Sequence, residues 1–520
     1  MKTRCLFPLA AFALWCSLPV ASAQAASSGS APASKPVPGF ADLHNHLFAE
    51  LAFGGAWLHG NVSGPELEAL AGCDGGDDHA RVRIPLVSRF IGATAGSTGD
   101  TGSHSGKKSG FPDYQGWPRW DTIAHQQVWS GWLKQAHEKG LNLLVVSAVN
   151  FEPLCQLMPE KNRKFDCKDM PAVDRQLDAV DKLVKSEPWM EIALSAKHAR
   201  EIIGRGHLAL VLSFEVSSPF PETDWKSSLD RYYGRGLRTL QLAHQLNDRF
   251  AGAAVHNYTF RVFQWIADIR SGSFLNWLHP WSYGFKTDSA TRNRLGLTED
   301  GKELVREMMR RGMLVDMAHL SEQTVKDIIQ LSESNHDYPL YISHGHFKEM
   351  MDDGKFSVYE KSSLRWVLEA VKKSGGIFGL RTGPEKTKGY AKSPVPNDCQ
   401  GSSKSFAQTY QYGVKDVGVP VAFATDMNGF IQQTRPRFGN SEETCGAERN
   451  KAERTRQQLA QKNTLGTPFD QTGLGKISQL GDLMTELKNF GVDTSPLESS
   501  AESFLVMWEK ADRLAVAKLK

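Results

Sequence analysis

Eight apolar runs, most of them separated by amphipathic helical patterns, recur along this 520-residue chain. A continuous apolar run is typical of a strand that is buried on both faces, as in a parallel sheet. Gly140 ends the helical pattern before the run at 141–149, and Gly204 and Gly206 end the pattern before the run at 207–216. The eight predicted strands are 40–48, 141–149, 207–216, 237–244, 313–319, 339–344, 376–381 and 419–426.

Helical patterns precede seven of these strands. The predicted helices are 121–139, 173–203, 227–233, 298–311, one that Ser321 caps, 362–373 and 406–414. Strands that alternate with helices indicate a parallel sheet, and eight repeats favour closure into a barrel. A doubly wound open sheet is the alternative, but no Gly-x-Gly-x-x-Gly turn follows the first strand. We therefore predict an α/β fold, a (β/α)8 TIM barrel, with long insertions at about 49–119 and 248–295 and a C-terminal helical extension at about 429–520.

The N-terminus has the pattern of a secretory signal peptide. Basic residues Lys2 and Arg4 precede an apolar core, and Ala21-Ser22-Ala23 is a small-residue cleavage site. We predict a signal peptide at 1–23, a disordered leader at 24–38 and one large domain at 39–520, in a protein that is secreted or periplasmic. Cleavage removes two positive charges, so the formal charge of +3 falls to +1. We therefore expect no nucleic acid and no anionic membrane as partner, and no later apolar run is long enough for a membrane span.

Five cysteines follow the predicted cleavage site, and export favours disulfides. Cys155 and Cys167 bracket one polar loop, whereas Cys399 and Cys445 flank the last predicted strand. We predict these two pairs and leave Cys73 free.

Two histidines on the first strand are the first sign of chemistry. His44 and His46 are two residues apart, so on a strand they point to the same face. Imidazole is the commonest ligand of zinc and similar metals. Two surface histidines in a loop would explain such a pair as well, so the other strand ends decide between the two interpretations.

The other predicted strands end in similar residues. One functional side chain lies at or near the carboxyl end of each of five further strands: Glu215, His244, His319, His344 and Asp426. Barrels of this kind build their active sites at that face. A single buried histidine is most often a hydrogen-bonded core residue, but ionisable groups gathered there are costly unless they are paired or bind metal. The set predicts a metal centre.

The number of ligands favours two metal ions. Four histidines with a shared carboxylate exceed the three protein ligands of a single catalytic zinc. Two metal ions that share Glu215 would account for all of these ligands. The two ions of such a centre lie ~3.5–4 Å apart. A bridging water would then lose its proton near neutral pH and act as the nucleophile.

Several segments around these residues carry a family resemblance. They are Leu212-Ser213-Phe214-Glu215, the strand that ends in His244, Asp316-Met317-Ala318-His319-Leu320-Ser321, Ile342-Ser343-His344, Thr425-Asp426-Met427-Asn428-Gly429, and the closing segment 503–509. From about residue 40 to the C-terminus, the chain resembles the membrane (renal) dipeptidases, zinc peptidases of the amidohydrolase superfamily.

The resemblance implies a role for each residue of the site. His44, His46 and Glu215 would hold one Zn²⁺, and Glu215, His319 and His344 would hold the other. His244 would polarise the scissile carbonyl or stabilise its oxyanion. Asp426 would take a proton from the bridging water and pass it to the leaving nitrogen. The expected function is that of an exported binuclear zinc hydrolase that cleaves an amide bond, with a dipeptide or similar small molecule as substrate.

Two departures from the family pattern keep other functions open. The family has aspartate where His46 stands, and it has a carboxylate-binding arginine after the histidine that His344 matches, whereas 345–361 contains none. Substitutes would come from Lys348, Lys355, Arg381, Arg435 or Arg437. A lactone, ester or phosphoester substrate is therefore the alternative, and a non-catalytic metal-binding protein is a third hypothesis. We expect His346 to face the metal ligands or the substrate rather than bind metal. The sequence leaves open whether the protein forms a homodimer.

Overall fold

The structure is a computed structural model, and it describes residues 35–71, 118–256, 263–264, 287–288, 292–352, 354, 360, 362–437 and 469–517. The predicted signal peptide and most of the predicted leader lie outside these ranges. So do large parts of both predicted insertions. The domain boundaries therefore stay predictions.

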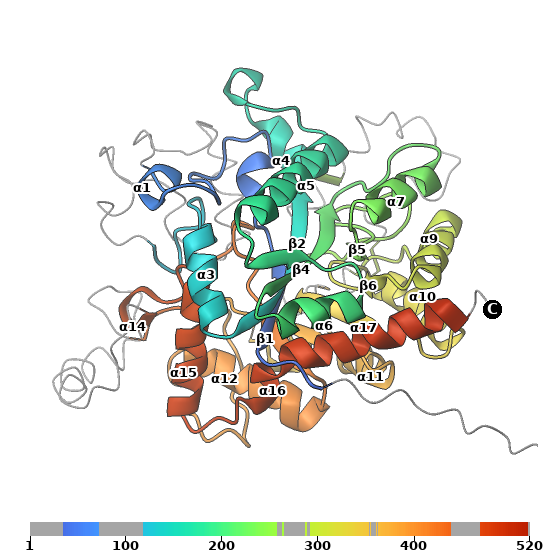
Figure 1. Cartoon of the computed structure of the whole chain (residues 1–520). Coiled ribbons are helices and arrows are strands. Elements are labelled where there is room, and N and C mark those ends of the chain that lie inside the picture. Colours follow the sequence, from blue (N-terminus) through green and yellow to red (C-terminus); the bar gives the residue numbers. More distant parts are fainter. Residues whose placement is uncertain are drawn as a thin grey trace, which may run out of the picture. The chain divides into compact units, whose positions relative to one another are not determined.

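Nine parallel strands form the centre of the fold (Figure 1). All except β3, which no apolar run had predicted, are almost wholly buried, as the apolar runs predicted. Their order across the sheet is β3 (Met190–Ile192), β4 (Leu208–Val216), β2 (Leu141–Asn150), β1 (Phe40–Asn45), β9 (Val421–Ala424), β8 (Phe378–Arg381), β7 (Leu340–Gly345), β6 (Leu314–Asp316) and β5 (Thr239–Gln241).

The sheet curls until its two ends meet. β3 pairs with the first half of β4, and the second half of β4 bridges from Leu212 to Leu237, just before β5. The Arg238 amide donates to the Leu212 carbonyl at 3.1 Å across this junction. The predicted α/β barrel fold is confirmed as a near-barrel of nine parallel strands.

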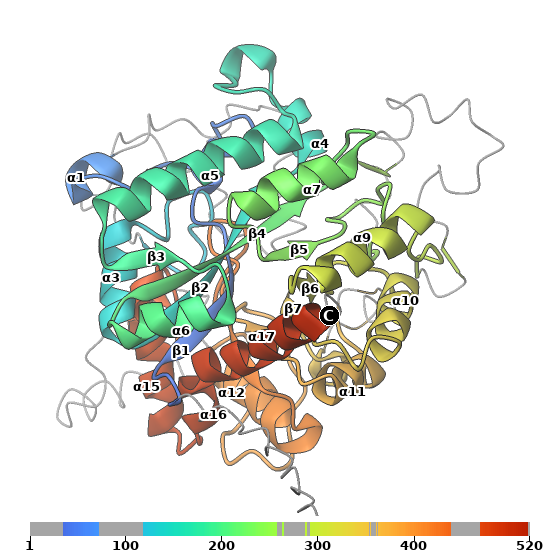
Figure 2. The same cartoon turned by 45° about the vertical axis from the view of Figure 1, so that its right-hand side comes forward.

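Helices surround the strands (Figures 1 and 2). Side chains cap several of them, including Ser321, whose Oγ accepts from the Thr324 amide as predicted. The helices are α1 (Glu66–Ala69), α3 (Ser130–Glu138), α4 (Glu152–Leu157), α5 (Asp169–Ser186), α6 (Ala196–Gly204), α7 (Trp225–Gly234), α9 (Glu299–Arg310), α10 (Glu322–Glu333), α11 (Arg365–Lys373), α12 (Ser403–Tyr412), α14 (Phe469–Thr472), α15 (Leu480–Asn489), α16 (Ser495–Glu498) and α17 (Ser500–Ala517).

Two predicted helices differ from the observed ones. The helix expected at 173–203 is split into α5, β3 and α6, because Pro188 cannot continue a helix and Ser195 caps a new one. The helix expected at 121–139 begins only at Ser130. Asp121 is not its cap, since its Oδ1 pairs with Arg119 Nε at 2.7 Å.

The C-terminal helix α17 lies against the beginning of β1. Ser500 Oγ accepts from the Ala41 amide at 2.9 Å, and the Val37 amide donates to Glu502 at 2.7 Å. Figure 2 shows α17 running beside α6, where Arg200 pairs with Glu502 at 2.7 Å and with Glu509 at 2.9 Å. The C-terminal extension is therefore part of the structure that fixes the first strand.

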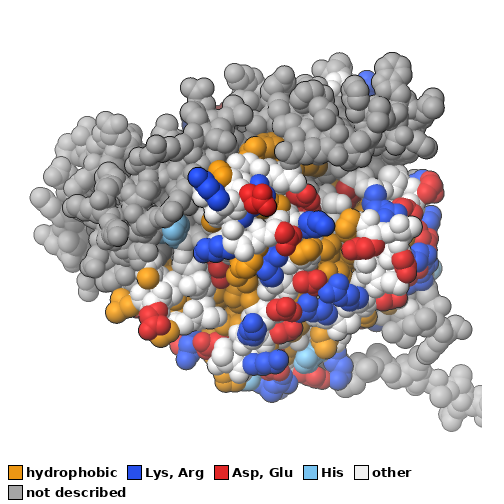
Figure 3. All heavy atoms as spheres, turned by 90° about the horizontal axis from the view of Figure 1, so that it is seen from above, with side chains coloured by type: hydrophobic (Ala, Val, Ile, Leu, Met, Phe, Trp, Pro, Cys, Tyr) orange, Lys and Arg blue, Asp and Glu red, His pale blue; other side chains and the backbone are white. Residues whose placement is uncertain are grey.

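One predicted disulfide is present, because Cys155 and Cys167 are bonded. Cys73 and Cys445 lie outside the described residues, so the rest of the cysteine assignment stays a prediction. Across the described ranges, no helix has both the length and the hydrophobicity that crossing a bilayer requires. The face in Figure 3 mixes acidic and basic side chains over its described part, in keeping with the small net charge.

Candidate metal centre

The structure brings all seven predicted residues together at the carboxyl ends of the strands. His44 lies on β1 and His46 directly after it, Glu215 is on β4 and His344 on β7. Three further residues follow β5, β6 and β9: His244, His319 and Asp426. Apart from His319, which is slightly more open, all are buried. Parallel strands present their carboxyl ends at one rim, which is why residues hundreds of positions apart meet.

Glu215 lies at the centre of the group. Its Oε2 is 2.7 Å from His44 Nε2, and its Oε1 is 2.9 Å from His244 Nε2. His46 Nε2 and His319 Nε2 lie 3.7 and 4.0 Å from Oε1. One carboxylate therefore contacts histidines from both sides of the barrel, which suits a bridging ligand.

Close contacts between nitrogens complete the arrangement. The Nε2 atoms of His44 and His46 are 3.2 Å apart, and those of His319 and His344 are 2.7 Å apart. His46 Nε2 also lies 3.0 Å from Asp426 Oδ1. Three sets of ligand atoms lie within 4.8 Å of one another: His44, His46 and Asp426; His44, Glu215 and His344; and Glu215, His244 and His319.

These residues fit a metal such as zinc. His46 Nδ1 lies 3.0 Å from the Ser147 carbonyl, which only accepts, so Nδ1 carries the proton and Nε2 offers a lone pair to the centre. Ligands around one tetrahedral zinc, at ~2.0–2.1 Å each, lie roughly 3.3 Å apart. The 3.2 Å between His44 Nε2 and His46 Nε2 matches that spacing. Imidazole nitrogens with a carboxylate are also the donors that zinc prefers.

The pKa values of the site follow from burial and from Glu215. Burial lowers the pKa of His319 and of His344 well below the usual value, so both are neutral and can act as ligands. Burial also disfavours the charged form of His44, but the adjacent Glu215 outweighs this and raises the pKa of His44 to about 9, so His44 would release a proton on binding a metal. Burial would raise the pKa of Glu215, yet His244 and His44 hold it well below its usual value. Glu215 is therefore ionised, as a carboxylate that binds a metal must be.

Two further buried aspartates, Asp42 and Asp316, hold the candidate ligands in position. Asp42 Oδ1 accepts from the Thr425 amide at 2.9 Å, and its Oδ2 accepts from the Thr425 hydroxyl at 2.7 Å. The Asp426 amide in turn donates to the His44 carbonyl at 2.8 Å. Asp42 thus ties the strand that bears His44 to the turn that bears Asp426.

Asp316 has the same role on the other side of the site. Its Oδ1 accepts from the Ser343 amide at 2.9 Å and from the Ala318 amide at 3.0 Å. These bonds join the segment that ends in His319 to the strand that bears His344. The signal was present in the sequence, because each aspartate precedes a ligand histidine by two or three residues.

The backbone is left-handed at two site residues. His319 has φ 61° and Asp426 has φ 52°, a conformation that non-glycine residues adopt only when the surroundings fix it. A further histidine, His256, stacks on the His319 ring with centroids 4.7 Å apart. No sequence pattern had marked His256, which comes from the predicted insertion at 248–295.

A cavity of about 670 Å³ opens over the centre. Six of the seven predicted residues line it, and the seventh, His44, is buried next to Glu215. His346 faces the cavity, as expected, and its Nε2 lies 3.2 Å from Glu385 Oε1. Of the cations considered as substitutes for the missing arginine, Arg381 and Arg435 line the cavity. Arg437 pairs with Glu486 instead, and Lys355 lies outside the described residues.

The family model described as membrane dipeptidase (peptidase family M19) matches residues 126–266 and 275–434, more than half of the chain. The chain belongs to the membrane dipeptidase family. Five of the site residues fall within the match, from Glu215 to Asp426, which confirms the predicted resemblance. The match begins after His44 and His46, so for these two the geometry carries the argument.

Individual members of the family align with this chain only over short segments and at low sequence identity. Dipeptidase verJ of Clonostachys rogersoniana is 31% identical over 96 residues, which cover 18% of this chain and 22% of that protein. Dipeptidase 3 of Mus musculus is 30% identical over 105 residues, 19% of this chain and 18% of its own length. The alignments thus span about a fifth of the length of these curated relatives.

Solved structures of similar proteins cover more of the chain. The probable dipeptidase PvdM from Pseudomonas aeruginosa is 14% identical, with a TM-score of 0.49 over 74% of this chain and 88% of that one. A metallopeptidase from Rhodobacter sphaeroides, liganded with a phosphinate mimic of the dipeptide L-Ala-D-Ala, is also 14% identical. Its TM-score is 0.44 over 73% of this chain and 89% of that one.

Proposed function

We propose that this protein is a binuclear zinc hydrolase that cleaves the amide bond of a dipeptide or similar small substrate. The observation that carries the proposal is the central position of Glu215: its Oε2 lies 2.7 Å from His44 Nε2, and its Oε1 lies 3.7 Å from His46 Nε2 and 4.0 Å from His319 Nε2. Family membership supports the reaction class. The N-terminal signal pattern supports export as part of the same proposal.

The ligands divide into two sets around Glu215. His44 and His46 with Glu215 would hold one zinc, and His319 and His344 with Glu215 would hold the other. The 3.2 Å between His44 Nε2 and His46 Nε2 supports the first set. His319 Nε2 and His344 Nε2 are adjacent at 2.7 Å, so they would have to separate slightly to bind one ion. Bound zinc would polarise the carbonyl and lower the pKa of water.

Asp426 and His244 are left for the proton and the substrate. Asp426 is buried and lines the cavity beside His46, so its carboxylate can accept a proton from the attacking water and deliver it to the leaving nitrogen. His244 also lines the cavity, and its ring can donate a hydrogen bond to the oxygen of the scissile carbonyl. The cavity is of a size that suits a small ligand.

An ester, lactone or phosphoester substrate is the second candidate, because 345–361 lacks an arginine. Zinc-reconstituted protein assayed on dipeptides and on acyl-lactones separates the two. We expect about two zinc ions per chain and turnover of dipeptides. Loss of both zinc and activity in His319→Ala would agree, whereas fewer than one bound metal after zinc addition would refute the proposal.

A further inference from the structure

We propose that Phe53, Phe151 and Phe430 form an apolar subsite beside the metal centre, which makes this site selective for dipeptides with a large apolar side chain. The inference rests on the proposed function and names the class of substrate that the same cavity would take.

The three rings lie over one sector of the barrel rim. Phe53 comes after β1, Phe151 directly after β2 and Phe430 after β9, and these strands are neighbours in the order β2-β1-β9. All three side chains line the cavity of about 670 Å³. Among the described residues, they are the only Phe, Tyr or Trp side chains that line it. Phe53 and Phe430 pack edge to face, with ring centres 5.3 Å apart.

The apolar subsite adjoins the two residues that are proposed to act on the proton and the carbonyl. The ring centres of Phe151 and His244 are 6.0 Å apart. Phe430 follows Asp426 by four residues, and a Cβ atom on the intervening Gly429 would overlap Asp426 Oδ1. A dipeptide whose amide bond lies at the metal centre therefore has these rings within reach of one of its side chains.

The backbone is left-handed at two of the three phenylalanines. Phe53 has φ 51° and Phe430 has φ 58°, which is uncommon for a bulky residue. Such a conformation persists only where the surroundings impose it, and it is often found at ligand-binding sites. The fold therefore holds these two rings at the cavity at some cost in conformational energy.

Asn150 connects Phe53 to the loop that the disulfide closes. Asn150 Oδ1 accepts from the Phe53 amide at 2.8 Å, and its Nδ2 donates to the Cys167 carbonyl at 2.9 Å. The Gly54 carbonyl accepts from the Lys164 amide at 2.7 Å, again within this loop. The segment that bears Phe53 is thus fixed against the disulfide loop.

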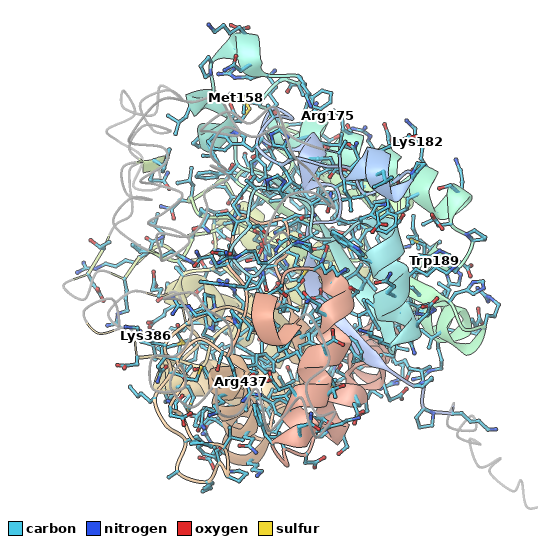
Figure 4. All side chains as sticks on the ribbon, turned by 90° about the vertical axis from the view of Figure 1, so that its left-hand side faces the viewer. Met158, Arg175, Lys182, Trp189, Lys386 and Arg437 are labelled. Atoms are coloured by element: carbon cyan, nitrogen blue, oxygen red, sulfur yellow. A yellow bond between two sulfur atoms is a disulfide. The ribbon has the colours of Figure 1, made fainter. Side chains whose placement is uncertain are left out.

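The disulfide loop is in turn fixed to α5. The Arg175 guanidinium lies over the Phe165 ring, 4.6 Å from its centre, and Arg175 Nη1 pairs with Asp166 at 3.2 Å. Figure 4 shows Arg175 and Met158, the residue after α4, in the upper part of that view. Because these contacts form without substrate, the apolar subsite is preformed, and binding requires little ordering of the protein.

The test compares L-Phe-L-Ala, L-Ala-L-Phe and L-Ala-L-Ala as substrates of the zinc-loaded enzyme. We expect at least one phenylalanine dipeptide to exceed L-Ala-L-Ala roughly 10- to 100-fold in kcat/KM, the range that burial of a large apolar side chain allows. Phe53→Leu and Phe430→Leu should each reduce this preference several-fold. Phe220→Leu is the matched control and should keep it, since Phe220 is also buried, with φ 49°, but packs against Phe214 outside the cavity lining.

Binding provides a second measurement that does not depend on turnover. Calorimetry should show L-phenylalanine binding more tightly than L-alanine to the wild type, with the difference reduced in Phe53→Leu and Phe430→Leu at unchanged zinc content. Equal cleavage of the three dipeptides, or an unchanged preference in both variants, would show that the rings do not select the substrate, while the proposed function stands. If the wild type cleaves none of the three, the proposed function itself is wrong, and the binding comparison alone decides on the apolar subsite.

Discussion

Thr425→Val probes the clamp that joins the first and last strands. Valine keeps the shape of threonine and keeps the backbone amide that donates to Asp42 Oδ1 at 2.9 Å. It removes the hydroxyl that donates to Asp42 Oδ2 at 2.7 Å. That oxygen is then left with Asn45 Nδ2 at 3.4 Å. A hydrogen bond to a charged group is worth about 1.5–3 kcal/mol when its partner stays buried, so the free energy of unfolding should fall by that amount.

The expected shift in melting temperature is small but measurable. A domain of this size unfolds with an entropy of about 1 kcal/mol/K, so the loss corresponds to a lower Tm by roughly 2–3 °C. Calorimetry on the zinc-free and zinc-loaded enzyme would measure it, and kcat should fall as well, because the same bond fixes the turn that carries Asp426. Thr425→Ser keeps the hydroxyl and should retain most of the stability. A valine variant with wild-type Tm and kcat would show that the bond between the Thr425 hydroxyl and Asp42 does not position the site.

Four further predictions concern chemistry and stability. Asp426→Asn should keep its zinc but lose on the order of 10²–10⁴ in kcat, and normal turnover would exclude the proton-transfer role. Chelation should lower the Tm, and added zinc should restore it, since the metal binds the folded state. Replacing Cys155 and Cys167, twelve residues apart, with serine should cost about 3 kcal/mol in denaturant unfolding, and the loss of stability caused by reductant should shrink by that amount. Burial raises the pKa of Glu360 from 4.5 to about 7, so the folded state holds a proton that the unfolded state releases. Stability should therefore fall by about 3 kcal/mol as the pH rises from about 4.5 to about 7, and Glu360→Gln should flatten that part of the profile.

Much of the site could be predicted because its functional residues lie at or near the ends of separate apolar runs in the sequence. An apolar run predicts a buried strand, and the rule that parallel strands meet at one rim places their last residues together. His319 and His344 could be assigned to the site from the ends of their strands alone, without knowledge of their contacts. The same reasoning located Glu215 at the centre of the set.

The remaining features depend on contacts that a linear pattern does not carry. β3 is three residues long and lies between two helices, so its apolar residues fitted the pattern of one long helix over 173–203. The position of Asp121 in the sequence predicted a helix cap, but its carboxylate pairs with Arg119 instead. Asp42 and Asp316 act through backbone amides of neighbouring strands, and those pairings become visible only in the folded chain. His44 illustrates the same limit, since its Nε2 lies closer to Glu215 than to His46.

The contacts of β1 also set the order in which this enzyme can be completed. β1 is made early, yet Asp42 pairs with Thr425, 383 residues later, and the Ala41 amide donates to Ser500, 459 residues later. Until those segments emerge from the ribosome, one edge of β1 stays open, and open strand edges invite pairing with other chains. The two halves of the metal centre cannot close before the chain is nearly finished. A metal ion that binds at this site would therefore be taken up where folding ends, from the metals available in that place, and not where synthesis begins.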